Sequence, residues 1–290
     1  MIKRVVLSFI FLLFLTQASQ AEIVWSCKSE PYPVMNAAGS FLTTVTGVNF
    51  AAHKTVEGVI RHNLKKDTGY NFDVDMKLFS VADLNNGKFK SLNFKAPELN
   101  LGGLYVRDFQ ANTACDYNQI IFTKDEPPKI YEDFIVNFKS TLNNDDLQKT
   151  LQSDQFQKYV KNVKIKVIGF QILSIENPKI EIANNKIRYS FRMMTPLMLS
   201  QLSQDVVCDL DLKVENGDIK FANATLQGKT SVPLDLILPI VNKINPFKIK
   251  LDNVTNVPSF IQVQNVAIID NKINVSGLFI APKNNVFVTK

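Results

Sequence analysis

Histidine is the side chain that most readily exchanges a proton near neutral pH, and it is a common metal ligand. The chain contains only two histidines, His53 and His62. Both fall in a segment that the spacing of apolar residues predicts to be helical, described below. Nine residues along a helix correspond to a rotation of about 900°, so the two rings point to opposite sides. We therefore expect no metal site or catalytic site shared by the two histidines.

Two pairs of carboxylates are spaced so that both members lie on one face of a strand: Asp73 with Asp75, and Asp209 with Asp211. Such pairs can serve in acid–base catalysis. Alternating charges are also typical of a strand face in contact with water, and we favour that interpretation. The sequence has no G-x-S-x-G, H-E-x-x-H, phosphate-binding glycine loop or dinucleotide fingerprint. It therefore predicts a protein that is not an enzyme and that uses no metal and no cofactor.

The first 21 residues have the three-part pattern of a cleavable secretory signal peptide. Lys3 and Arg4 form a basic start, residues 5–15 are apolar except for one serine, and Ser19 and Ala21 place small side chains at a cleavage site. The apolar run is too short to cross a bilayer, which favours a cleaved signal over an uncleaved anchor. We therefore predict export to the periplasm or cell envelope.

Cleavage would leave 269 residues with a net charge of +4 instead of +6, because Lys3 and Arg4 leave and no acidic residue goes with them. Apolar residues make up 46% of the chain, which is ample for a core. The lysines are scattered, so we predict no nucleic-acid partner, only weak attraction to anionic membrane surfaces.

The mature chain would keep three cysteines: Cys27, Cys115 and Cys208. An oxidising compartment permits one disulfide among them, with three pairings and one thiol left over. The sequence leaves the choice open, and it contains no C-x-x-C motif.

Periodicity divides the first half of the chain into one helix followed by strands. Apolar residues recur on one stripe of residues 46–66, which predicts an amphipathic helix. Residues 70–79, 89–99, 104–113 and 119–124 alternate between apolar and polar, as half-buried antiparallel strands do. The proline-containing residues 125–129 are the best candidate for an internal joint.

The second half is predicted to be mostly strand. Residues 143–146 can cap and begin a helix near 144–160. Three pairs of turn residues, at 184–185, 216–217 and 270–271, separate alternating strands and predict β-hairpins. Residues 233–246 are apolar almost all round and contain a central proline, Pro239. That composition predicts a helix that is buried in the core or lies against an apolar ligand.

The order of these segments resembles the LmeA-like phospholipid-binding family of exported bacterial proteins. The resemblance rests on residues 84–106, with a glycine turn, an alternating strand, Gly102-Gly103 and a second strand, and on residues 245–251, 256–263 and 270–277. Ser259 stands where that family usually has glycine. The resemblance would extend over residues 44–282. It implies an α+β fold in which a curved, mostly antiparallel sheet wraps on a long N-terminal helix with further short helices, as in tubular lipid-binding proteins.

The family resemblance also implies that phospholipid or a related acyl lipid is bound or shuttled in an apolar cleft without catalysis. We expect a signal peptide (1–21), an N-terminal extension (22–43) and a single lipid-binding-like domain (44–290). Two alternatives are a β-rich envelope scaffold without a cavity and, less favoured, an envelope hydrolase with a histidine beside Asp73 or Asp75. The candidate lipid-lining residues are apolar residues of the two predicted helices and the sheet: Val56, Val59, Ile60, Leu92, Phe94, Leu236, Ile237, Ile240 and Val241.

Overall fold

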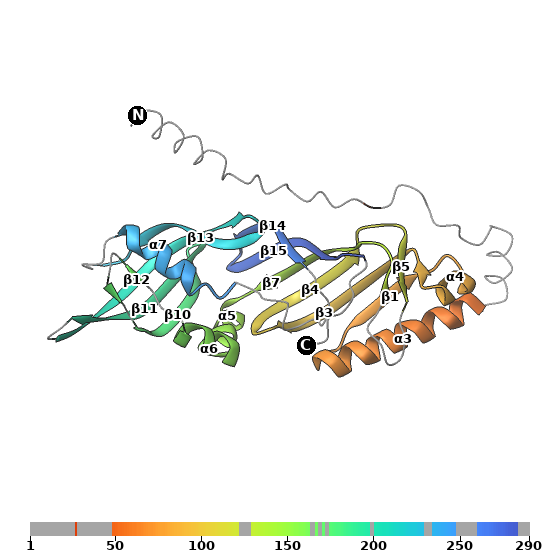
Figure 1. Ribbon diagram of the computed structural model, residues 1–290, viewed down its shortest axis with the longest axis horizontal. Helices are drawn as coiled ribbons and strands as arrows, with labels where there is room; N and C mark the ends of the chain where they lie inside the picture. The colour runs from red at the N-terminus through yellow and green to blue at the C-terminus, as the bar shows by residue number, and fades with distance from the viewer. Residues whose placement is uncertain are drawn as a thin grey trace, which may run out of the picture.

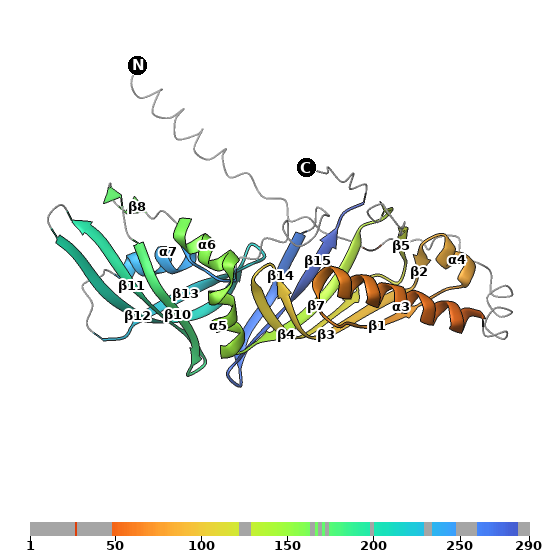
Figure 2. The same cartoon turned by 90° about the horizontal axis from the view of Figure 1, so that it is seen from below.

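The structure is a computed structural model, and it describes Cys27 and residues 48–121, 129–162, 166–167, 170–171, 174–197, 200–228, 234–247 and 260–283. The predicted signal peptide lies outside the described residues. So do the predicted extension, apart from Cys27, and most of the candidate joint at 125–129. The molecule is elongated, with one large antiparallel sheet towards each end (Figures 1 and 2).

A six-stranded sheet forms one end of the molecule, in the order β1-β3-β4-β7-β15-β14 with every neighbouring pair antiparallel. β4 and β7 precede and follow the candidate joint, so both sides of that segment contribute to one sheet. The strands are β1 (Asp73–Lys77), β3 (Ser91–Leu101), β4 (Leu104–Thr113), β7 (Phe134–Leu142), β14 (Phe260–Ile269) and β15 (Lys272–Ala281).

A four-stranded antiparallel sheet forms the other end, in chain order. Its strands are β10 (Ser174–Ala183), β11 (Lys186–Leu197), β12 (Ser200–Glu215) and β13 (Asp218–Leu226). Short strands make up two small sheets: β2 (Lys88–Phe89), β5 (Asn118–Ile121) and β6 (Lys129–Ile130) in one, β8 (Lys166–Val167) and β9 (Phe170–Gln171) in the other. The two large sheets meet where the β12–β13 turn reaches β14, and the Val263 N–H donates to the Gly217 carbonyl (2.8 Å).

The described helices lie beside these sheets (Figures 1 and 2). α5 packs against β4 of the larger sheet and β10 of the smaller one, and α7 packs against β13. The helices are α3 (Val48–Thr68), α4 (Val81–Asn85), α5 (Asn144–Gln152), α6 (Asp154–Asn162) and α7 (Leu234–Lys243).

The predicted fold class, an α+β tubular lipid-binding-like sheet wrapped on a long N-terminal helix, is wrong. The structure is β-rich, its strands form separate antiparallel sheets, and no sheet wraps around α3. α3 lies along β1 at the sheet edge, where the Glu57 carboxylate accepts a hydrogen bond from Met76 N–H (3.0 Å) and Arg61 donates to the Val74 carbonyl (2.8 Å). The apolar stripe of α3 is also narrow, since Val59 is 55% exposed. A helix enclosed by a sheet would have to be apolar nearly all round.

The predictions of individual helices and hairpins are mostly confirmed. The helix predicted over 46–66 is α3, and the three predicted hairpins are β10–β11, β12–β13 and β14–β15. Asn184 and Asn185 have left-handed backbones (φ 53° and 56°), as a two-residue turn of this kind requires. The single helix predicted near 144–160 is two, because Ser153 ends α5 and its hydroxyl accepts a hydrogen bond from Phe156 N–H in α6 (3.3 Å).

The helix start at 143–146 forms as predicted. The Asn143 side chain accepts from Asp146 N–H and the Asp146 carboxylate accepts from Asn143 N–H, both at 3.0 Å. Asp146 is buried and also pairs with Arg107 of β4 at 2.8 Å. The Asp146 carboxylate therefore both caps the start of α5 and connects this helix to the larger sheet.

Candidate functional site

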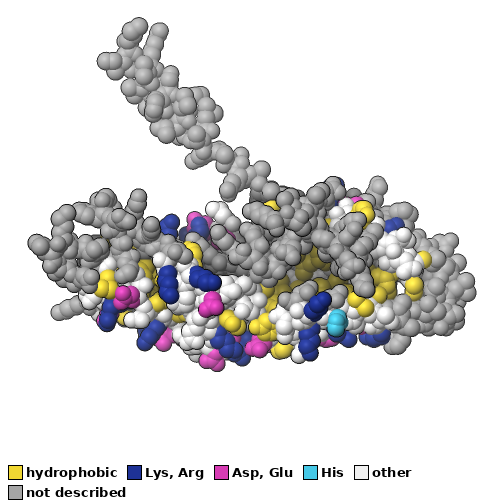
Figure 3. Space-filling model, turned by 60° about the horizontal axis from the view of Figure 1, so that its bottom comes forward, with side chains coloured by type: hydrophobic (Ala, Val, Ile, Leu, Met, Phe, Trp, Pro, Cys, Tyr) yellow, Lys and Arg dark blue, Asp and Glu magenta, His cyan; other side chains and the backbone are white. Residues whose placement is uncertain are grey.

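An apolar groove of about 320 Å³ lies on one face of the six-stranded sheet. In Figure 3 hydrophobic side chains gather in a recessed band in the middle of the molecule. The volume is at the lower end of the roughly 300–1,000 Å³ typical of small-molecule sites. The described lining residues come mainly from β3, β4, β7, β14 and β15: Leu64, Phe72, Phe94, Leu99, Leu101, Leu104, Val106, Phe109, Ala111, Phe134, Val136, Phe138, Ser140, Leu142, Ile219, Phe247, Ile261, Val263, Val275 and Phe279.

Strand register brings a small residue between two large ones at the centre of the groove. Ala111 of β4 is the register partner of Phe94 on β3 and of Phe138 on β7. Directly opposed residues in an antiparallel sheet share a face, with Cβ atoms about 5 Å apart. The short Ala111 side chain therefore leaves a hollow between the two rings.

A bulge in β4 lets four of its side chains face the groove. Val106 and Phe109 both line it, although residues three apart on a regular strand face opposite sides. The register shifts between Arg107 and Gln110, and Asp108 there has a left-handed backbone (φ 49°). The Thr141 hydroxyl donates to the Asp108 carboxylate (2.9 Å), which holds the bulge in place.

The far end of the groove is fixed by one buried amide. The Asn245 side chain donates to the Ile219 carbonyl (2.7 Å) and accepts from Phe247 N–H (2.9 Å). Ile219 and Phe247 are both wall residues, so Asn245 connects the smaller sheet to the segment after α7. Sequence reasoning missed this role, for which the only signal is a polar residue following an almost wholly apolar helix.

The groove surface is hydrocarbon almost throughout. Ser140 is the single lining residue with a polar side chain, and its hydroxyl contributes almost nothing to the surface. No charged side chain lines the groove among the residues that the structure describes.

Only Phe94, among the nine residues predicted to line a lipid site, lies on this groove. Leu92 is buried in a smaller apolar cluster with Val74 and Met76, and the α3 residues Val56 and Ile60 pack against that cluster. Val59 is exposed to solvent.

The α7 residues lie in the main core instead. Ile237, Ile240 and Val241 are fully buried there, and Leu236 packs against the same cluster. The helix predicted over 233–246 is therefore a core helix in its observed packing, and its residues are not brought together with those of α3.

The candidate catalytic residues whose side chains the structure describes are not assembled into a site. Asp73 and Asp75 are exposed on one face of β1, and the cation within 4 Å of Asp73 is Arg61 (3.8 Å). His62 is exposed on α3, and the side chain of His53 lies outside what the structure describes. In the described part of the chain no group of His, Cys, Asp and Glu residues could hold a metal ion.

The second carboxylate pair serves cross-strand ion pairing. Asp209 accepts from Arg188 (2.9 Å), and Asp211 lies 3.1 Å from Lys186. The pKa of Asp211 is lowered by its hydrogen bond from Asn223 and by Lys186. Asp211 lies on a partly exposed strand face, whereas Asp209 is buried and its carboxylate also accepts a hydrogen bond from the Gln227 side chain (2.8 Å).

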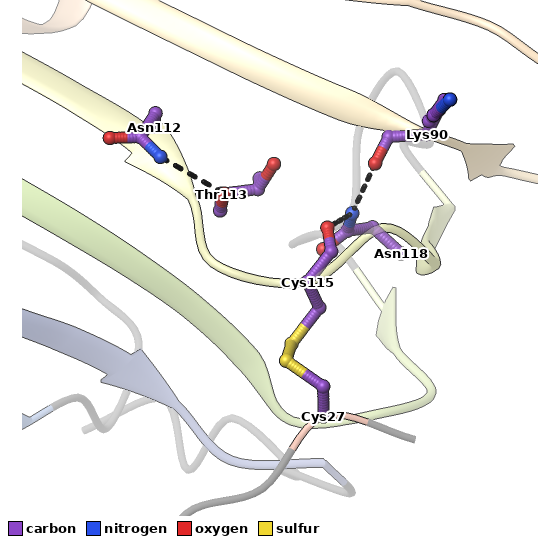
Figure 4. The surroundings of a disulfide bond; sticks show 6 residues. All are labelled: Cys27, Lys90, Asn112, Thr113, Cys115 and Asn118. Carbon is purple, nitrogen blue, oxygen red and sulfur yellow. Dashed lines mark hydrogen bonds between the residues drawn. A yellow bond between two sulfur atoms is a disulfide. The ribbon is translucent and has the colours of Figure 1, made fainter. Parts of the chain in front are cut away.

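A disulfide joins Cys27 to Cys115 (S–S 2.07 Å), and Cys208 is a buried free thiol. Figure 4 shows the surroundings of Cys115 after β4, where the Asn118 amide donates to the carbonyls of Cys115 (2.8 Å) and Lys90 (3.0 Å). Burial raises the pKa of Cys208 to about 12. The disulfide is compatible with an exported protein, because such bonds persist in oxidising compartments.

None of the described helices combines the length and the apolar character that crossing a membrane requires. Comparison of this chain with known protein families, with curated proteins and with solved structures finds no match.

Proposed function

We propose that this chain is an exported cell-envelope protein that binds phospholipid or a related acyl lipid without catalysis. The observation that carries the proposal is the groove, which is lined by seven phenylalanines and twelve other apolar residues with a single serine. Protein interiors are close-packed, so an apolar hollow of this size is not expected in a solid core. The resemblance to the LmeA-like phospholipid-binding family supports the same function.

Binding would follow from removal of the acyl chain from water. Each buried methylene contributes about 0.8 kcal/mol, so a few methylenes in contact with Phe94, Phe138 and their neighbours give a useful affinity. The polar end of the lipid would stay in water. The net charge of +4 that remains once Lys3 and Arg4 leave with residues 1–21 favours weak peripheral contact with anionic membrane surfaces, from which such a lipid would be taken up.

Native mass spectrometry of protein purified from its own cell envelope tests this proposal. We expect a co-purified lipid in the wild-type protein, and we expect Ala111→Phe to lose it because the larger ring fills the hollow between Phe94 and Phe138. Asn112→Phe is the matched control. Asn112 is exposed at the next position of the same strand, so a phenylalanine there places the same ring on the other face of the sheet.

Three outcomes separate the possibilities. Lipid lost only in Ala111→Phe supports the proposal. Equal lipid content in all three proteins places the lipid elsewhere and contradicts it. If wild-type protein carries no lipid and takes none up in vitro, the scaffold alternative replaces it.

A further inference from the structure

The polar and apolar side chains of the larger sheet are separated onto its two faces. Phe94, Ala111 and Phe138 line the apolar groove. Lys95 and Lys139, which follow Phe94 and Phe138, border a second hollow of about 420 Å³ together with Asp73, Asp75, Asn93, Gln110 and Asn112, and Phe94 and Ala111 border it as well. Its polar and charged residues are register partners of one another across β1, β3, β4 and β7, so their side chains share the face opposite the one on which Phe94, Ala111 and Phe138 are partners. The backbone of the sheet itself therefore stands between these charges and anything bound in the groove.

The cations that directly follow the wall residues Val106 and Leu64 are poorly placed to hold a charged head. Arg107 follows Val106 but donates two hydrogen bonds to Asp146, at 2.9 and 2.8 Å. That pairing raises the pKa of Arg107. Lys65 and Lys66 follow Leu64 on α3 but are exposed to water, where their attraction for a charged head is weak and screened by salt.

We infer that the groove recognises the hydrocarbon chain of its ligand and does not discriminate among polar heads. The inference rests on the proposed function. Among the residues that the structure describes, no charged group and no exposed hydrogen-bonding group lines the groove, so these residues offer the head no specific contact. The class of ligand is then any lipid with a suitable chain, whether its head is anionic, zwitterionic or uncharged.

A displacement assay with ligands that share one chain tests the inference. A fluorescent fatty acid bound to the full-length mature protein is displaced by palmitic acid, hexadecanol and palmitoyl lysophospholipids with choline or glycerol heads, each below its critical micelle concentration. We expect dissociation constants that agree within about fivefold, because a charge-assisted hydrogen bond to one head would separate them by more than about tenfold. The values should be insensitive to salt between about 0.05 and 0.5 M.

Two variants sharpen the assay. Ser140→Ala should change the affinities for all four ligands by the same factor, and Ala111→Phe should weaken the binding of all four. A spread above fivefold, a fall in affinity with salt, or a loss confined to one head in Ser140→Ala overturns the inference and leaves lipid binding intact. If no ligand displaces the probe, or if Ala111→Phe binds as the wild type does, the proposed function itself fails.

Discussion

Replacement of Gly277 by alanine tests whether β14 and β15 approach as closely as the structure has them. A Cβ atom at this position would lie 2.2 Å from the Gln262 carbonyl oxygen and 2.8 Å from Val263 Cα. Both are backbone atoms of β14, so no side-chain rotation can relieve the overlap and the strand itself must move. The register shift between Val263 and Asn265 marks a bulge at the same place, and bulges bring backbones close.

Overpacking of this kind costs about 1–3 kcal/mol, and overlap with backbone atoms of two successive β14 residues favours the upper value. At roughly 2–4 °C per kcal/mol for a chain of this size, Gly277→Ala should lower the Tm by about 6–12 °C. The measurement is thermal unfolding followed by circular dichroism. Because Val263 is a groove residue, lipid content should fall as well.

Gly58→Ala is the control, since Gly58 lies inside α3 with nothing within 4 Å of an added Cβ. Alanine in a helix interior is favoured over glycine by up to about 1 kcal/mol, so this variant should gain about 2–4 °C. A Tm for Gly277→Ala within about 2 °C of the wild type would refute the close approach of the two strands.

Three further predictions concern the thiols and the ion pairs. Joint replacement of Cys27 and Cys115 by alanine should cost up to about 4–5 kcal/mol in the chain-entropy treatment of a loop of 88 residues; a Tm unchanged from the wild type would contradict a stabilising disulfide. Cys208 should react with a thiol reagent only after unfolding, because burial keeps its thiol protonated; labelling of the native protein within seconds at pH 8 would disagree. Arg192 lowers the pKa of Asp205 below its ordinary value of 3.8, so this pair stabilises the fold above that pH and the contribution is lost as the pH falls through the lowered pKa. In Asp205→Asn the acid-induced loss of unfolding free energy should be shallower, and an identical acid profile would count against the pair.

Sequence reasoning succeeded where the determinants are local. The turn at Asn216-Gly217 needs left-handed backbone, which those residue types adopt easily (φ 55° and 79°). The helix start at Asn143 needs only Asp146, three residues further on. These features depend on short stretches of chain, so a single sequence contains them in full.

The groove could not be predicted in that way. Its central hollow depends on Ala111 being opposite Phe94 and Phe138, residues that are adjacent only once the register of three strands is known. The bulge at Asp108, which turns Phe109 to the groove, is also set by a partner on another strand, Thr141. Periodicity predicted half-buried strands over 89–99 and 104–113 without telling whether the space beyond them is filled, and it predicted no strand where β7, which contains Phe138, lies.

The position of the helices gives a physical reason why this face is left open. Side chains of three helices form hydrogen bonds with backbone groups of the strands at three sheet edges. Glu57 and Arg61 of α3 do so at β1, Asn144 and Gln148 of α5 at β10, and Asn242 of α7 at both backbone groups of Phe221 in β13.

Unpaired strand edges can pair with other chains, and in this β-rich protein polar side chains of α3, α5 and α7 protect three of them. A helix that lies at an edge cannot also cover the middle of a sheet. The apolar face centred on Ala111 is therefore only partly covered by the described elements, and Leu64 is the one α3 residue with a described side chain that reaches it. Since so much apolar surface is costly to leave in water, the arrangement that protects the edges is also the one that favours an acyl chain in the groove.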